Sequence, residues 1–201
     1  MFRRRIISRC EKYIESSLDR TKRYVRRIQE TRIHRLTRMP VLLCSETDLT
    51  ELETLLARFG LSVKFVAENE DIPGSFWKPP EAGLISNTLY VRDDTPVHSA
   101  LHEACHYICM DEKRRTDLHT DAAGDYAEED GVCYLQILLA DFIPEMSKQR
   151  MFDDMDEWGY SFRLGSSRAW FEGDAEDAKQ WLVTNSIITE NDIPTWNYRS
   201  Q

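Results

Sequence analysis

The residues of this chain whose types and spacing best suit chemistry are His102, Glu103 and His106, in the run His-Glu-Ala-Cys-His. On an α-helix, side chains four positions apart lie one above the other on the same face, so both imidazoles can reach one metal ion. Glu103 lies about 100° around the helix from His102, close enough to hydrogen-bond a water at that metal without being a ligand. This spacing predicts a metal centre with His102 and His106 as ligands and Glu103 as a catalytic base.

A catalytic metal site of this kind needs a third protein ligand, usually a carboxylate, and one position left open for water. Residues 128–140 offer such a ligand at the start of a second, strongly apolar helix. Glu128 continues the stripe of apolar residues that follow four, seven and eleven positions later. A carboxylate at the head of a buried stripe is costly unless it is paired or bound to metal. Glu128 is therefore the expected third ligand, and Glu129 is the alternative.

A helix over residues 95–110 must position the two histidines. Pro96 fits its first turn, where no N–H is needed, and Asp94 or Thr95 can cap it. Immediately before this helix, residues 85–92 alternate apolar and polar side chains, which predicts a strand. A strand in that place can form one edge of a cleft, where an extended peptide can pair by strand addition.

The rest of the chain beyond Pro40 completes an α+β domain. The patterns predict, in chain order, a helix over 49–59 that ends at Gly60, a strand over 61–66, a helix over 146–158 and a last helix capped by Asp174.

Two groups of residues have more than one interpretation. Phe76 and Trp77 lie in a loop rich in Pro, Gly and acidic residues, and they are either core residues or part of a substrate wall. Residues 111–127 form a polar connection between the two metal-binding helices. In it, His119 and Tyr126 are candidates to hydrogen-bond an oxyanion at the metal, and loop residues in water are the alternative.

Charge divides the chain into two parts. Residues 1–39 carry 13 Lys and Arg against 4 Asp and Glu, whereas the remainder carries 13 against 31. Apolar residues recur every three to four positions in the first part, so residues 1–38 are predicted to be a basic amphipathic arm that can contact an acidic surface. A loosely attached arm, or a translated stretch upstream of an initiator at Met39, is the favoured interpretation, because no motif from Met39 onward needs this segment. Residues 39–201 are the predicted metal-binding domain, whose acidity argues against nucleic acid as its partner.

Composition points to a soluble, cytoplasmic protein. With 201 residues, of which 41% are hydrophobic and 30% charged, the chain can bury one sizeable core. No apolar run approaches the ~20 residues that span a bilayer, and the first residues lack the apolar segment of a signal peptide. The five cysteines form no Cys-x-x-Cys pair, which is typical of free thiols in a reducing compartment.

The order of these features resembles the minimal metallopeptidase core of the ImmA/IrrE type, which is a zincin. That resemblance rests on the His-Glu-x-x-His helix and on the run Glu128-x-x-Gly131-x-x-Tyr134-Leu135-x-x-Leu138-Leu139. The first helix, with Lys113-Arg114-Arg115 and Glu128, is also similar to the bacterial elongation factor P hydroxylase family. Both resemblances imply a zincin-like α+β fold, in which a small sheet accompanies the active-site helix and a second ligand-bearing helix.

The two resemblances imply different chemistry on one donor set, His102, His106 and Glu128. In the first, which is the leading hypothesis, Zn²⁺ and an activated water hydrolyse a peptide or amide bond of a peptide or protein substrate, with Glu103 as the general base. In the second, Fe²⁺ takes the same ligands and the chain hydroxylates a side chain of a partner protein. A non-catalytic, zincin-derived regulatory module is the third hypothesis.

Overall fold

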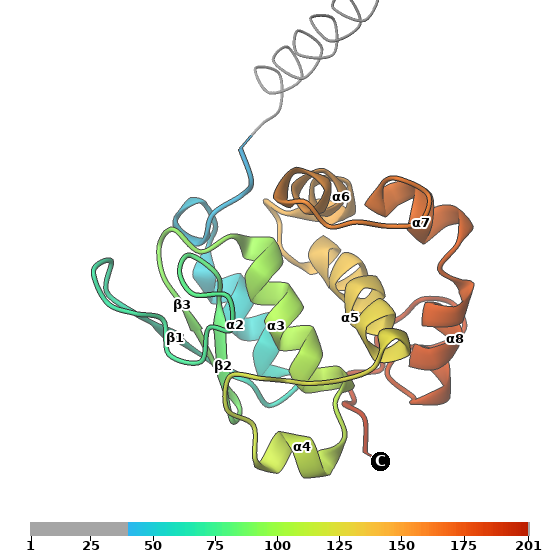
Figure 1. The fold of residues 1–201 in the computed structure, drawn as a ribbon, viewed down its shortest axis with the longest axis horizontal. Helices are drawn as coiled ribbons and strands as arrows, with labels where there is room; N and C mark the ends of the chain where they lie inside the picture. The colour runs from blue at the N-terminus through green and yellow to red at the C-terminus, as the bar shows by residue number, and fades with distance from the viewer. Residues whose placement is uncertain (1–39, 201) are drawn as a thin grey trace, which may run out of the picture. The chain divides into compact units, whose positions relative to one another are not determined.

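The computed structural model describes residues 40–200, so the predicted basic arm over 1–38 lies outside the described residues. The elements are η1 (Cys44–Glu46), α2 (Leu49–Ala57), β1 (Ser62–Phe65), β2 (Gly83–Ile85), β3 (Thr88–Val91), α3 (Val97–Cys109), α4 (Glu112–Thr116), α5 (Tyr126–Leu139), η2 (Ala140–Phe142), α6 (Ser147–Trp158), α7 (Ser167–Gly173) and α8 (Glu176–Thr184). Helices together with a small sheet make this part an α+β structure. Helices α3 and α5 pack against each other at its centre, with the sheet beside α3 and α8 beside α5 (Figure 1).

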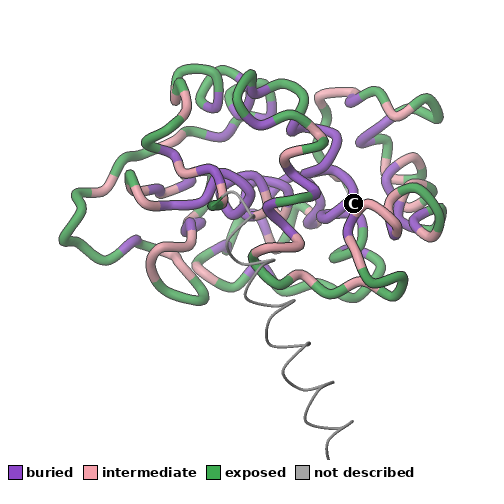
Figure 2. The backbone as a smooth tube through the Cα atoms, turned by 90° about the horizontal axis from the view of Figure 1, so that it is seen from above, coloured by how far each residue is buried: buried purple, intermediate pink, exposed green. Residues whose placement is uncertain are grey.

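The core forms where these two central helices meet their neighbours. Buried positions gather in the interior of the described part, and exposed positions lie on the outer loops (Figure 2). Most residues of α3 are buried, and so is every residue of α5 from Gly131 to Leu139. Gly131 allows α8 to approach closely, because a Cβ atom there would lie 2.8 Å from Trp181 Cε3. None of the helices between residues 40 and 200 has the length and apolar content that crossing a bilayer would take.

The single strand predicted over residues 85–92 is instead a hairpin. Strand β2 ends at Ile85, the chain turns at Ser86 and Asn87, and β3 returns antiparallel to β2. Ser86 has a φ of 51°, in the left-handed region that two-residue hairpin turns favour. Strand β1 pairs in parallel with the other side of β3, so the order is β1-β3-β2 and β3 is central.

The edge of this sheet next to α3 is therefore β2, and the chain itself covers it. Ser86 N donates to Leu118 O at 2.8 Å, and Thr120 N donates to Leu84 O at 3.0 Å. Between these two hydrogen bonds, Ile85 and His119 form an isolated antiparallel β-bridge. The prediction of a free strand edge for an extended peptide is corrected here, because residues 118–120 use the backbone groups of β2 that a peptide would need.

Residues 40–42 are tied into the domain by α6. Leu42 N donates to Asp154 Oδ2 at 2.8 Å, and Arg150 Nε donates to Asp154 Oδ1 at 2.7 Å. Arg150 also donates to the carbonyl of Pro40, and Asp154 is almost fully buried. These contacts hold the first described residues against α6.

We expect a protein that lacks residues 1–38 to fold as the full chain does, because the contacts at Pro40 and Leu42 are retained. Thermal unfolding followed by circular dichroism would check this. If the truncated protein is insoluble or unfolds at a markedly lower temperature, the arm is part of the folded domain and the division of the chain at Met39 is wrong.

Candidate metal centre

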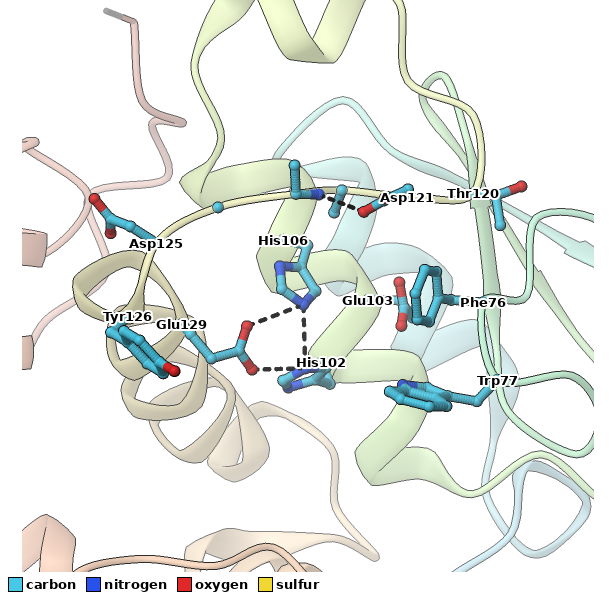
Figure 3. A pocket seen from close by; sticks show the side chains of 13 residues that line it. Phe76, Trp77, His102, Glu103, His106, Thr120, Asp121, Asp125, Tyr126 and Glu129 are labelled. Carbon is cyan, nitrogen blue, oxygen red and sulfur yellow. Dashed lines mark hydrogen bonds and ion pairs between the residues drawn. The ribbon is translucent and has the colours of Figure 1, made fainter.

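Two histidines and one glutamate come together between α3 and α5 (Figure 3). His102 Nε2 lies 3.1 Å from His106 Nε2, and Glu129 places Oε1 3.3 Å from His102 Nε2 and Oε2 3.6 Å from His106 Nε2. Ligands held at 2.0–2.2 Å around a tetrahedral zinc ion are separated by about 3.3–3.6 Å. The two distances to Glu129 match this spacing, and the distance between the two histidines is slightly shorter.

Helix geometry accounts for this placement. The two imidazoles lie on one face of α3, as their spacing of four predicts. Glu129 lies in the first turn of α5, which begins where the Asp125 side chain caps the helix by accepting a hydrogen bond from Glu128 N at 3.0 Å. The cap fixes the start of α5, and with it the side of the helix on which Glu129 faces the histidines.

Glu128, the favoured third ligand, does not lie at the histidines. It accepts hydrogen bonds from Arg114 Nη1 at 2.9 Å, Arg114 Nη2 at 2.6 Å and Arg199 Nη1 at 3.0 Å. Its side chain is only 5% exposed. This buried carboxylate is paired, as expected, but its partners are two guanidinium groups and not the histidine site. One position along a helix is a rotation of about 100°, and this rotation turns the alternative, Glu129, toward α3.

A buried glutamine orients His102. Gln136 Oε1 accepts a hydrogen bond from His102 Nδ1 at 2.7 Å, and Gln136 Nε2 donates to Met151 Sδ at 3.4 Å. Since an amide oxygen can only accept, Nδ1 carries the proton and Nε2 presents its lone pair to the site. Gln136 was not among the residues predicted for the site. Its signal was a single polar side chain within the buried run of α5.

The charge preferences of the two imidazoles differ. Burial disfavours charge on His102, but Tyr160, Cys133 and Glu129 outweigh burial and hold its pKa well above the usual value. The pKa of His106 is lowered to about 3, first by burial and then by His102. The surroundings of His102 thus favour positive charge at this ring, whereas those of His106 favour the neutral imidazole with a free lone pair.

Gln136→Met is expected to lower metal affinity by a factor of about 10–100, the usual effect of losing the hydrogen-bond partner of a ligand histidine. Methionine has a similar length but offers only a weak acceptor, so His102 loses its fixed orientation while the core stays filled. Competition with a chelating dye would measure the affinity. Gln136→Glu, which keeps an acceptor at this position, is the matched control. Unchanged affinity in Gln136→Met would show that the contact plays no part in metal binding.

Glu103 lies on α3 beside the ligands and faces the cavity above them (Figure 3). It is 8% exposed, and no donor from residues 40–200 hydrogen-bonds to its carboxylate. Burial raises its pKa to about 7, an effect that His102 opposes and that Glu81 and Glu129 reinforce. Glu103 is therefore a basic carboxylate with free acceptor positions beside the proposed ion.

The cavity over the three ligands has a volume of about 670 Å³. One wall holds Phe76 and Trp77, which are 51% and 72% exposed, and the opposite wall holds Tyr126 at the start of α5. Residues 120–125 complete the rim. Phe76 and Trp77 therefore belong to the cavity wall and not to the core. Of the two candidates for oxyanion binding, Tyr126 lines the cavity, whereas His119 does not and instead lies 2.9 Å from Thr120 Oγ1 through its Nδ1.

No family model, curated protein or solved structure matches the chain. Two imidazoles and one carboxylate suit both Zn²⁺ and Fe²⁺. An ion held by these side chains would have three protein ligands, whereas structural zinc sites are closed by four.

Proposed function

We propose that the chain is a metal-dependent hydrolase of peptide or other amide bonds, with a divalent ion held by His102, His106 and Glu129. The observation that supports this most strongly is that the three ligand atoms and the unpartnered Glu103 carboxylate face the same open cavity. A ligand set and a base that share one cavity are what metal-assisted hydrolysis requires.

When bound, the ion supplies a Lewis acid for the substrate carbonyl and lowers the pKa of a water at the open position. Glu103 accepts a proton from that water as the oxygen bonds to the carbonyl carbon. Glu103 then returns the proton to the leaving nitrogen as the C–N bond breaks. Gln136 keeps His102 oriented throughout, and burial keeps Glu103 basic enough for both transfers.

Glu103 also favours hydrolysis over hydroxylation by an iron centre with the same ligands. Hydrolysis depends on a group that accepts the proton of the attacking water, and Glu103 has free acceptor positions for it in the cavity. Hydroxylation at an iron centre does not depend on a base at this position.

We expect zinc-loaded protein to cleave members of a peptide library, as followed by mass spectrometry. A chelator should abolish this cleavage and added zinc should restore it. Products that are heavier by one oxygen atom, and that form only with iron and dioxygen, would show that the chain is a hydroxylase and not a hydrolase. If fully metal-loaded protein forms neither kind of product, the chain is a non-catalytic module.

A further inference from the structure

We infer that the cavity above the metal centre recognises a cationic group, the ammonium or guanidinium of a peptide, between its aromatic wall and its carboxylates. The cleavage of a bound peptide rests on the proposed function, whereas the binding of the cationic group does not. Four features of the cavity support it: its charge, its aromatic wall, the free base within it and the covered sheet edge beside it.

The charge of the lining is one-sided. The lining carries the carboxylates of Glu103, Asp121, Asp125 and Glu129 and no Lys or Arg side chain. Asp121 Oδ1 accepts from Ala123 N at 2.8 Å and Asp125 Oδ1 accepts from Glu128 N at 3.0 Å, so each aspartate has a second oxygen with no hydrogen bond among the described residues. A divalent ion would offset the charges of Glu129 and Glu103, and the two aspartates leave the rim anionic.

The nearest arginine does not neutralise this rim. Arg114 lies behind it, where Nη1 donates to Ala122 O at 3.0 Å. Arg114 lies 2.6 Å from Glu128 and 2.8 Å from Asp111, and Glu128 also pairs with Arg199 at 3.0 Å, so two carboxylates match the two arginines. The potential at the cavity mouth is therefore set by the aspartates, and it favours a cation.

The aromatic wall supplies a second kind of contact for a cation. Phe76 and Trp77 pack edge to face, with ring centroids 5.0 Å apart and planes at 81°, and much of both rings remains exposed. Tyr126, on the opposite wall, is 93% exposed. Large aromatic side chains left exposed around one cavity mark a binding site. Their faces attract ammonium and guanidinium groups.

The buried base places the reaction beside this contact. Glu103 is more than nine-tenths buried, accepts no hydrogen bond from the described residues and lines the same cavity as Phe76 (Figure 3). A cation held at the aromatic wall would therefore bring the amide bonds attached to it close to Glu103 and the ligands.

The covered edge of β2 removes strand addition as a way to recognise a peptide beside the cavity. Residues 118–120 occupy the edge of β2, so an extended backbone cannot be recognised there by strand addition. Recognition then depends on a group that projects into the cavity, either a side chain or a chain terminus. Both sources offer the same chemistry when the group is a Lys, an Arg or a free amine.

A peptide series tests the inference through binding alone, with the full zinc-loaded chain and isothermal titration calorimetry. The peptides are acetylated and differ at one position, which holds Lys, Arg, norleucine or Glu, and a further norleucine peptide has a free amine. We expect the cationic peptides to bind at least about tenfold more tightly than acetylated norleucine, and salt to weaken them. If only the free-amine peptide gains affinity, the recognised cation is the chain terminus. Norleucine or Glu peptides that bind as tightly as Lys would overturn the inference.

Two variants locate the contact. Trp77→Ala should weaken the Lys peptide about two- to fivefold, the scale of an exposed cation–π contact. Phe65→Ala, at an exposed aromatic on β1 away from the cavity, is its control. Asp121→Asn removes charge but keeps an acceptor for Ala123 N, and should also weaken the Lys peptide. Its control is Asp117→Asn, at an exposed aspartate outside the cavity lining. If neither cavity variant differs from its control, the cation binds elsewhere and the inference fails.

Binding and turnover fail separately in this design. Preference for cationic peptides without cleavage would contradict the proposed hydrolase and leave the inference standing. If neutral peptides are cleaved as fast as lysine peptides and bind with equal affinity, the proposed hydrolase stands and the inference fails.

Discussion

Glu129→Gln is expected to lose stoichiometric metal and keep its fold, whereas Glu128→Gln is expected to keep metal and lose stability. The first change replaces an anionic ligand with a weak neutral one, on a side chain that is 48% exposed and supports little packing. The second removes the charge that pairs with Arg114 and Arg199 in a site where Glu128 is only 5% exposed. Breaking a buried ion pair usually costs about 3–5 kcal/mol, and we expect about 2–3 kcal/mol here because both arginines are one-quarter exposed.

Metal analysis and urea unfolding of the two variants would check these outcomes, under conditions in which both are folded. The two residues are neighbours and undergo the same chemical change, so each variant serves as the control for the other. Loss of metal in Glu128→Gln with retention in Glu129→Gln would mean that the sequence-based preference for Glu128 was right and that the arrangement of α5 described here is wrong.

Glu103→Gln should keep its metal but lower hydrolytic turnover by a factor on the order of 10² or more, the scale of a lost general base. Glutamine keeps the shape of the side chain and its ability to hydrogen-bond, but it cannot accept the proton from water. His102, His106 and Glu129 are untouched, so metal content should stay near that of the wild type. Stability should not fall, because the change removes a buried charge that has no hydrogen-bond donor among the described residues.

Steady-state kinetics on the cleaved peptide, with metal content measured on the same samples, separates the two roles. Metal loss in Glu103→Gln would make this residue a ligand. Retention of both metal and turnover, with iron as the bound ion, would favour the hydroxylase over the hydrolase.

The local part of the metal centre could be predicted from sequence, because it depends on one helix. The spacing of His102 and His106 sets their common face whatever packs around α3. The third ligand depends on which side of α5 meets α3, and burial alone does not decide it. Glu128 was correctly expected to need a partner, but Arg199, one of its two partners, lies 71 positions away. The periodicity of α5 cannot predict a contact with a residue so distant in the sequence.

The errors in the fold have equally specific causes. The alternation of side chains continues through the two-residue turn at Ser86 and Asn87, so the hairpin has the pattern of one long strand. Helices α4 and α7 are five and seven residues long, too short to show a helical period. Their only signals are the capping side chains of Asp111 and Ser166.

Elemental analysis of the protein, purified without added metal, tests the central claim most directly. The wild type should contain one zinc ion per chain, and His102→Ala and His106→Ala should each lack it and unfold at a lower temperature, because bound metal stabilises the folded state. Full metal occupancy in both variants, or a wild type that takes up no metal even when zinc is supplied, would contradict the assignment of these residues as a metal centre.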